Sequence, residues 1–356
     1  MRVDAHKVQF RFTDSVEHTV GVKAGERVLD AALQQGVPIL HQCRSGSCGS
    51  CVGRLVEGDA QMCSTVAASL LKSEQKEGFR LTCVCDVHSD SVFEFDYAST
   101  AGEVIPEKVS VFIDAIDWLA RDVVNLKLEL AEGDWMDFQP GQFVQIRVPG
   151  SQEYRRYSMA SSPQELPRME LLVRVLEQGV MSDYLRDRAK IDDQLEIEGP
   201  FGSFFWRENL KSPHVFIAGG TGLAPMMSML DVIRQKSGIK PGLLLSFGCQ
   251  DESSLFHGDE LELRELWMPT LQTRISLDRG DRTKGIEVGN PVQAIGPDDV
   301  CTNTVAYLCG PPRMIQAAHE HLESLGVKPE NIHAEQFVAT ETLPLFGAID
   351  DNKGEK

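Results

Sequence analysis

Apolar and polar residues alternate in two short stretches near the N-terminus, as expected for the two strands of a β-hairpin. The apolar positions are Val8, Phe10, Phe12, Val20 and Val22. From residue 26 to 35 the apolar positions recur every four residues instead, which predicts a short helix. Residues 92–95 predict a further strand, and together these elements make a first segment that we expect to span residues 1–97.

Two further segments differ from the first in the spacing of their apolar runs. Residues 108–207 contain many short strand patterns and one short helix pattern, which predicts a small antiparallel β-barrel. The expected strands are 109–113, 126–130, 143–148, 169–175 and 195–197, and the helix is 182–188.

Residues 208–339 alternate strands with helices, which predicts an α/β unit with a parallel sheet. Its expected strands are 215–218, 243–247 and 305–309, and its helices are 225–234 and 314–325.

The stretches between and after these segments lack such patterns. Residues 98–107 are polar and rich in small residues, with Gly102 and Pro106, and are predicted to form a linker. Residues 340–356 predict a loosely ordered tail. A chain of 356 residues is too long for one ordinary core, so we expect a multidomain protein.

The composition is that of a soluble globular protein and argues against some classes of function. Of all residues, 42% are hydrophobic and 25% are charged, and no apolar run reaches the roughly 18 residues of a membrane span. The stretch from Met1 to Phe10 has no signal-peptide core, so we expect a cytoplasmic protein with no membrane partner. The net charge of −18 argues against nucleic-acid binding and serves either solubility or the attraction of a basic protein partner.

Six of the nine cysteines lie within one short region, and their spacing predicts a metal centre. Cys43, Cys48 and Cys51 have the C-x4-C-x2-C spacing of a plant-type [2Fe–2S] cluster, and we expect Cys83 to be the fourth ligand. The glycines and serines between these cysteines let backbone N–H groups approach the sulfurs of a negatively charged cluster. Cys83 is preferred because it ends the stretch Leu81-Thr82-Cys83, where the ferredoxin pattern expects a ligand.

Two other interpretations of the cysteines remain. A zinc site made of Cys48, Cys51, Cys83 and Cys85 would use a C-x-C pair, which is short for zinc, and would leave Cys43 over. Buried cysteines without a metal would explain neither the spacing nor the glycines. For Cys63 and Cys85 themselves, packing in the core is the expected role.

A tetrapeptide in the second segment resembles a flavin-binding motif. Arg155-Arg156-Tyr157-Ser158 resembles the R-x-Y-S signature of ferredoxin–NADP⁺ reductase-like proteins. The resemblance implies that Arg155 holds an FAD phosphate, that Tyr157 packs on the isoalloxazine ring and that Ser158 contacts flavin N5. An exposed strand with a stray basic pair is the alternative for this tetrapeptide taken alone.

A second motif follows about twenty residues later, just before the expected helix. It consists of Gly179, Val180, Met181 and Ser182 and resembles the second FAD motif of the same family. In that family the motif binds pyrophosphate at a helix N-terminus, where free N–H groups and the helix dipole favour an anion. Ser182 as an ordinary N-cap is the alternative, and both can hold. The GPFG sequence at 199–202 then ends the barrel as in that family.

A glycine-rich turn in the third segment predicts a nicotinamide site. Gly219, Gly220, Thr221 and Gly222 follow an expected strand, and Pro225 suits the first turn of the next helix. Glycines there allow dinucleotide phosphates to approach the backbone. The run is not G-x-G-x-x-G; it resembles the GGTGxxP version of the reductase family, in which the threonine lies near the nicotinamide.

Two later motifs complete the resemblance. Cys309, Gly310 and Pro311 resemble the CGPP motif, which implies that Cys309 lies beside nicotinamide C4; a buried strand cysteine is the alternative. Glu335 and Phe337 resemble a terminal E-x-F, in which the phenylalanine covers the flavin and the glutamate joins the nicotinamide site. The resemblance thus implies that Ser158, Cys309 and Glu335 take part directly in catalysis.

The stretch after the second strand of the third segment favours NADH over NADPH. Residues 248–253 offer Asp251 and Glu252 and no basic residue, whereas NADPH enzymes usually place Arg or Lys against the 2′-phosphate. Arg279 and Arg282 are the basic residues that could still reach that position.

Over residues 8–338 the chain resembles reductases of the benzoate and anthranilate 1,2-dioxygenase type. The resemblance implies an α+β, ferredoxin-like β-grasp [2Fe–2S] domain, an antiparallel β-barrel FAD domain and an α/β NAD domain. The implied function is that of an NAD(P)H:ferredoxin-type oxidoreductase that passes electrons from NADH through FAD and the cluster to a terminal oxygenase of the Rieske non-haem iron type. Reductases of diiron monooxygenases share this order and remain an alternative, as does a redox sensor without turnover.

Overall fold

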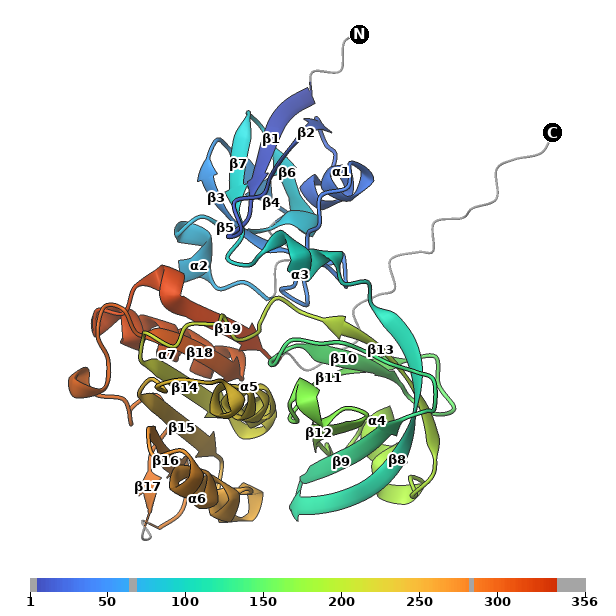
Figure 1. Ribbon diagram of the computed structural model, residues 1–356, viewed down its shortest axis with the longest axis vertical. Helices are drawn as coiled ribbons and strands as arrows, with labels where there is room; N and C mark the ends of the chain where they lie inside the picture. Colours follow the sequence, from blue (N-terminus) through green and yellow to red (C-terminus); the bar gives the residue numbers. More distant parts are fainter. Residues whose placement is uncertain (1–4, 64–68, 282–284, 338–356) are drawn as a thin grey trace, which may run out of the picture.

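The computed structural model describes residues 5–63, 69–281 and 285–337, which form three domains (Figure 1). The first domain, drawn blue to cyan, lies above a barrel domain on the right and an α/β domain on the left. The predicted tail at 340–356 lies outside the described residues. No helix within the described ranges is long and apolar enough to cross a membrane.

The first domain is a mixed five-stranded sheet covered by a helix. Its strands are β1 (Ala5–Arg11), β2 (Glu17–Lys23), β3 (Val52–Glu57), β5 (Phe79–Leu81) and β7 (Ser91–Glu94), in the order β2-β1-β7-β3-β5. The predicted hairpin is confirmed, because β1 pairs antiparallel with β2, and β7 runs parallel to β1. The predicted helix is α1 (Val28–Gln34), whose buried side Val28, Leu29, Ala31 and Ala32 covers the core. The β-grasp expectation therefore holds.

Smaller elements complete the first domain and lead into the barrel. They are β4 (Ala60–Met62), α2 (Lys72–Lys76), a 3₁₀ turn (Thr82–Val84) and β6 (Cys85–Val87). A further helix, α3 (Ser99–Glu103), lies within the predicted linker.

The second domain is an antiparallel barrel of six strands. They are β8 (Glu107–Ala120), β9 (Val123–Leu130), β10 (Phe143–Arg147), β11 (Tyr154–Ser158), β12 (Arg168–Arg174) and β13 (Gln194–Phe201), in the order β11-β10-β13-β8-β9-β12. A bridge between Met159 and Leu171 joins the two ends of this order and closes the barrel. Alternate residues of β8, such as Val109, Val111 and Ile113, fill the interior, as their period-two pattern predicts. The predicted helix is α4 (Val180–Asp187).

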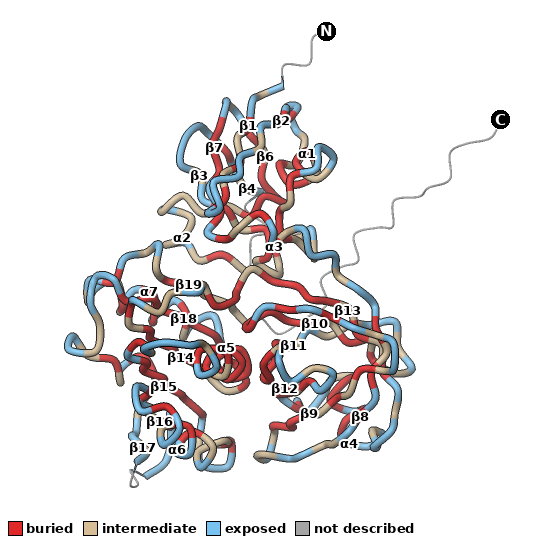
Figure 2. Tube along the Cα trace, in the orientation of Figure 1, coloured by how far each residue is buried: buried red, intermediate tan, exposed pale blue. Residues whose placement is uncertain are grey.

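The third domain is a parallel sheet with helices on both faces. Its strands are β14 (His214–Gly219), β15 (Leu243–Cys249), β16 (Leu271–Leu277), β17 (Ile286–Val288), β18 (Val305–Gly310) and β19 (Ile332–Gln336), in the order β17-β16-β15-β14-β18-β19. The helices are α5 (Leu223–Gln235), α6 (Gly258–Trp267) and α7 (Pro312–Ser324). Buried residues of α5 and α6 share one core, while those of α7 share a second core on the opposite face. Figure 2 shows α5 as a buried helix between the sheet and the barrel.

This strand order positions a binding site. The order of the strands reverses between β14 and β18, which are neighbours in the sheet although three strands lie between them in the sequence. In open parallel sheets, ligands bind at the carboxyl ends of the strands at such a switch point. The glycine turn after β14 and the CGPP residues after β18 both lie there.

Candidate redox site

The predicted cluster ligands converge at the lower end of the first domain. Cys43, Cys48 and Cys51 occupy the loop between α1 and β3, and Cys83 lies in the 3₁₀ turn after β5. The thiol of Cys43 interacts with those of Cys48 and Cys83, and the thiol of Cys51 interacts with that of Cys83. The structure thus brings all four predicted ligands together, in a connected series of contacts that runs from Cys48 to Cys51.

The loop backbone is shaped to meet the sulfurs. The Ser45 and Ser47 backbone N–H groups donate to Cys43 Sγ at 3.4 and 3.3 Å. Gly46 and Gly49 have φ of 76° and 73°, a left-handed conformation that glycine adopts without strain. The thiols of Cys48 and Cys83, followed by Ser47 and Ser45, lower the pKa of Cys43 against the opposing effect of burial. Such donors favour a thiolate, the form that binds iron.

The spread of the thiols distinguishes a binuclear cluster from a zinc ion. A single zinc ion holds its thiolates at about 2.3 Å, so all ligand sulfurs lie within about 4 Å of one another. Within the described ranges, no three cysteine sulfurs lie within 4.8 Å of one another. The donor set is therefore too wide for one zinc ion and fits a [2Fe–2S] cluster, in which two irons share the four thiolates.

The two remaining cysteines of this region behave differently. Cys85 is fully buried in the core of the first domain, as expected, and burial raises the pKa of its thiol to about 12. Cys63 is exposed, so the expectation that it packs in the core is wrong. Its position after the short edge strand β4 leaves it at the surface.

One cavity of about 1120 Å³ joins the three domains at this point. Ser47 and Cys48 of the cysteine loop line one end of it. The predicted flavin residues that line it are Arg155, Tyr157, Ser158, Gly179, Met181, Ser182 and Phe337, and the predicted nicotinamide residues are Gly219, Gly220, Thr221 and Pro311. Glu335 lines it as well, whereas Val180, Gly222, Cys309 and Gly310 do not. Its size and its mixed polar and apolar lining suit dinucleotide cofactors.

The barrel side of the cavity is formed by β11 and the start of α4. Tyr157 is partly buried, and burial raises its pKa above the ordinary value. The Arg155 guanidinium donates to Glu153 at 2.5 Å at the cavity wall. Helix α4 begins at Val180 with Gly179 as its N-cap, so the alternative that Ser182 is the N-cap is wrong. The Ser182 hydroxyl instead accepts the Leu176 N–H at 2.9 Å and holds the preceding loop.

On the α/β side of the cavity, the backbone of the glycine turn packs closely against the backbone of β18. Gly222 lies so near β18 that a Cβ there would overlap the Cys309 carbonyl group. Cys309 itself is completely buried in β18, and burial raises the pKa of its thiol well above the ordinary value. Its place beside a nicotinamide therefore stays a prediction.

A hydrogen bond across the cavity links the barrel to the α/β domain. Ser158 Oγ donates to Glu335 Oε2 at 3.0 Å. Burial raises the pKa of Glu335 to about 7, and the hydrogen bond from Ser158 and the charge of Arg156 only partly offset this effect. Two residues separately predicted to be catalytic are thus direct partners.

Acidic and basic side chains both lie near the end of β15 in the described part of the chain. Arg279 lies 3.5 Å from the Asp251 carboxylate, which pairs with its charge, and Arg282 lies outside the described residues. Arg121 also lies near Asp251, and Arg174 lines the cavity. The pairing of Arg279 with Asp251 is the feature that agrees with the preference for NADH.

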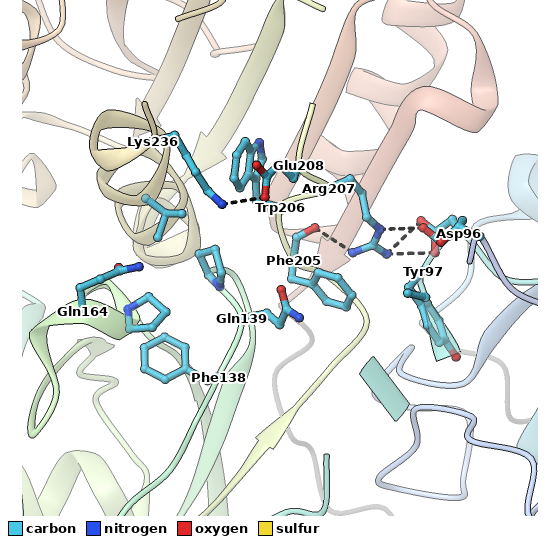
Figure 3. Close-up of a pocket in the computed structure, with 15 residues that line it drawn as sticks. Asp96, Tyr97, Phe138, Gln139, Gln164, Phe205, Trp206, Arg207, Glu208 and Lys236 are labelled. Atoms are coloured by element: carbon cyan, nitrogen blue, oxygen red, sulfur yellow. Dashed lines mark hydrogen bonds and ion pairs between the residues drawn. The ribbon is translucent and has the colours of Figure 1, made fainter. Parts of the chain in front are cut away.

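The first domain is held in place by side chains that carry no sequence motif. Gln42 donates to Gln145 of the barrel at 2.9 Å. Arg207, at the junction of the barrel and the α/β domain, donates to both carboxylate oxygens of Asp96 at 2.9 Å (Figure 3). His333 Nδ1 lies 3.1 Å from the same carboxylate. The sequence analysis missed these residues, because contacts between positions so far apart leave no local pattern.

Figure 3 also shows the second cavity, of about 650 Å³, beside this Arg207–Asp96 contact. Phe138, Trp206 and Lys236 line it, and none of the predicted site residues does. It is therefore separate from the candidate redox site.

Comparison with known proteins gives the same three parts in the same order. Residues 12–88 match the 2Fe-2S iron-sulfur cluster binding domain family, 111–206 the oxidoreductase FAD-binding domain family, and 216–320 the oxidoreductase NAD-binding domain family. These matches support a [2Fe–2S] cluster, FAD and NADH as the cofactors, in agreement with the fit of the residues described above.

Similar proteins match nearly the whole length of the chain. The toluate 1,2-dioxygenase electron transfer component of Pseudomonas putida is 33% identical, over 94% of this chain and 99% of that one. The propane 2-monooxygenase reductase component of Rhodococcus jostii is 32% identical, over 96% of this chain and 93% of that one. The crystal structure of the Amycolatopsis cytochrome P450 reductase GcoB has a TM-score of 0.69 at 26% identity, covering 93% of this chain and 98% of that one. The chain therefore belongs to the family of iron–sulfur flavoprotein reductases that supply electrons to oxygenases.

Proposed function

We propose that this protein is the NADH-dependent reductase of an aromatic-ring dioxygenase, and that its partner is a Rieske non-haem iron oxygenase. The observation that carries the proposal is the single cavity into which the cysteine loop, the flavin motifs and the nicotinamide turn all open. Three similar dioxygenase components are named for toluate, 2-halobenzoate and anthranilate, which are all aromatic acids. The clustering of six of the nine cysteines, with spacing that suits a metal centre and not disulfides, supports a reducing, cytoplasmic location.

We assign the cluster to Cys43, Cys48, Cys51 and Cys83. The FAD site is assigned to Arg155, Tyr157, Ser158, Gly179, Val180, Met181, Ser182 and Phe337, and the NADH site to Gly219, Gly220, Thr221, Gly222, Cys309, Gly310 and Pro311. When bound, these groups supply the redox chemistry: NADH gives a hydride, FAD takes up two electrons and releases them singly, and the cluster carries one electron at a time. The chain contributes binding and orientation, and β14 and β18 fix the glycine turn against the barrel.

Ser158 and Glu335 are the polar pair that we place beside the reacting atoms. The Ser158 hydroxyl donates to Glu335 while that carboxyl is ionised. Protonation of Glu335 removes its charge and leaves the hydroxyl of Ser158 free to donate into the cavity, where it would support an atom that gains negative charge. With a pKa of about 7, this exchange falls in the range of physiological pH.

The rate of flavin reduction by NADH is therefore expected to fall as pH rises through about 7, because ionised Glu335 then binds the Ser158 hydroxyl. In the Glu335→Gln variant this step in the pH profile should disappear, and the rate above pH 8 should exceed that of the wild type by up to about tenfold. Stopped-flow measurement of the loss of flavin absorbance gives the reduction rate at each pH, and so tests both the step in the profile and the rate above pH 8. Ser158→Ala should flatten the profile as well, whereas Glu330→Gln, an exposed acid, should leave it unchanged; an unaltered step in Glu335→Gln would exclude this role.

The function itself is tested with the purified protein and a Rieske oxygenase encoded beside it. NADH should reduce both the flavin and the iron centre, seen by absorption and by electron paramagnetic resonance, and should drive turnover of an aromatic acid by the oxygenase. If the protein reduces cytochrome c with NADH but supports no coupled turnover with any Rieske component, this proposal is contradicted. Absence of NADH-driven cytochrome c reduction would leave only the sensor alternative.

A monooxygenase reductase is the second candidate. The propane 2-monooxygenase reductase components are nearly as similar to this chain as the dioxygenase components are, at up to 32% identity. Coupled turnover with a monooxygenase hydroxylase in place of the Rieske component would favour this candidate.

A further inference from the structure

A cluster of three side chains lies where the first domain meets the α/β domain, away from the redox cavity. Glu77 follows α2 in the first domain, and His319 and Glu323 lie one turn apart on α7. Figure 1 shows α2 directly above α7. Among the described residues this is the one group of three His, Cys, Asp or Glu side chains whose ligand atoms all lie within 4.8 Å of one another.

The buried histidine of this cluster has an unsatisfied polar atom. His319 is 1% exposed, and its Nδ1 has no hydrogen-bond partner in the described structure. That nitrogen lies 3.4 Å from Glu323 Oε1, and Glu77 Oε2 is also buried without a hydrogen-bond partner. Buried polar atoms are nearly always paired with protein, water or an ion, because leaving one unpaired costs about 1–3 kcal/mol. Two such atoms within one cluster therefore indicate a missing positive or donating group.

The neighbouring charges do not supply that group. The Arg54 guanidinium donates to the backbone carbonyl of Glu77 at 3.4 Å and not to its carboxylate. Glu74, the next acidic residue, accepts the Leu71 N–H at 2.6 Å and adds a further negative charge to the region. Two carboxylates in contact repel each other unless a proton or a cation lies between them.

We propose that Glu77, His319 and Glu323 form a binding site for a divalent transition-metal ion such as Zn²⁺, which bridges the first domain and the α/β domain. One imidazole nitrogen and two carboxylate oxygens are ligands that suit zinc and its neighbours, whereas Mg²⁺ and Ca²⁺ prefer oxygen alone. Zinc holds such ligands at about 2.0–2.2 Å, so in its usual tetrahedral site the ligand atoms lie about 3.3–3.6 Å apart. Starting from separations within 4.8 Å, side-chain shifts of up to about 1 Å complete the site.

The site has a structural consequence that is independent of the redox function. His319 and Glu323 share one face of α7 at the i, i+4 spacing, but the third ligand comes from another domain. Neither domain alone offers three ligands, so metal binding requires the two domains to be docked. An ion that binds the docked form stabilises that form by mass action.

The test uses the full-length protein with its flavin and iron–sulfur cluster, in buffer freed of metals by a chelating resin, and Zn²⁺ as the probe. Isothermal titration calorimetry is expected to give about one zinc ion per chain, and zinc should raise the melting temperature. Glu77→Gln and Glu323→Gln should each weaken zinc binding by at least about tenfold and remove most of the thermal shift. Glu320→Gln, an exposed acid on the same helix, is the matched control and should bind as the wild type does.

Iron content and the visible spectrum are measured in parallel, to show that zinc has not displaced the cluster. The proposal is overturned if the wild type binds no zinc at 100 μM or below. It is also overturned if Glu77→Gln and Glu320→Gln bind zinc equally well, since the zinc then lies elsewhere. If Glu77→Gln raises the melting temperature in the absence of metal and zinc has no effect on either protein, the two carboxyl groups share a proton and there is no metal site.

Discussion

Replacing Cys83 with alanine is expected to abolish cluster assembly, whereas Cys85→Ala should leave the cluster in place. The two cysteines are separated by one residue, but they face different surroundings. The Cys83 thiol interacts with those of Cys43 and Cys51, while Cys85 lies in the apolar core of the first domain. Loss of one of four thiolate ligands should leave iron near zero in Cys83→Ala and lower NADH-driven cytochrome c reduction by at least about 100-fold.

Two measurements separate loss of the cluster from loss of the fold. Reduction of ferricyanide by NADH, which needs the flavin but not the iron centre, should stay within about twofold of the wild type in both variants if the modules act separately. Cys85→Ala removes a buried sulfur and should cost about 1–2 kcal/mol of stability, seen as a lower melting temperature. A fully iron-loaded Cys83→Ala protein, or an iron-free Cys85→Ala protein, would show that the fourth ligand is wrongly assigned.

The cysteine pair also shows where sequence spacing stops being informative. The distances between Cys43, Cys48 and Cys51 are short and therefore specify the loop, but Cys83 and Cys85 fit the longer spacing almost equally well. The choice depends on the 3₁₀ turn at Thr82–Val84, which faces Cys83 toward the loop, and on β6, which faces Cys85 into the core. For Cys63 the sequence was misleading. Free cysteines are usually buried, so core packing was expected, but Cys63 follows the short strand β4 and its side chain is exposed.

Elements with a strong apolar pattern were predictable, and polar elements were not. The run 243–247 predicted β15, whose seven residues are all buried in a parallel sheet covered on both faces. Helix α6 was missed because only Leu261 and Arg264 are buried, whereas Leu266 is 75% exposed and Trp267 is 57% exposed. Such a helix has no continuous apolar face for a periodicity search to detect.

The motifs of the site were predictable, but most of its lining and its assembly were not. Each motif depends on a turn and a few neighbouring side chains, and together the motifs supply about a third of the residues that line the cavity. The contact between Ser158 and Glu335 joins positions 177 residues apart, and that between Asp96 and Arg207 joins positions 111 residues apart. Packing of three domains produces these pairs, and no local pattern encodes that packing.

The second large effect is expected from Gly222→Ala, which should raise the KM for NADH by about 100-fold, a loss of about 2–3 kcal/mol. A Cβ at this position would lie 2.6 Å from the carbonyl carbon of Cys309 and 3.1 Å from the Gly310 nitrogen. Both atoms belong to the backbone at the end of β18, which is fixed between β14 and β19. The turn must therefore move away from β18, and the site at the switch point loses its shape.

Two other glycines of the same turn provide matched controls. At Gly219 a Cβ would meet Met314 Sδ at 2.7 Å, which belongs to a flexible side chain that can move aside, and Pro311 Cδ at 3.0 Å, which requires a shift of only a few tenths of an ångström. At Gly220 nothing lies within 4 Å, although its φ of 54° carries a cost of about 1 kcal/mol for alanine. Steady-state kinetics should therefore show a much larger increase in the KM for NADH with Gly222→Ala than with the other two variants.

Flavin content and reduction by dithionite should be normal in all three variants, because the barrel and the cysteine loop are untouched. A Gly222→Ala protein that binds NADH within about threefold of the wild type would mean that the turn is not held against β18 as the structure has it.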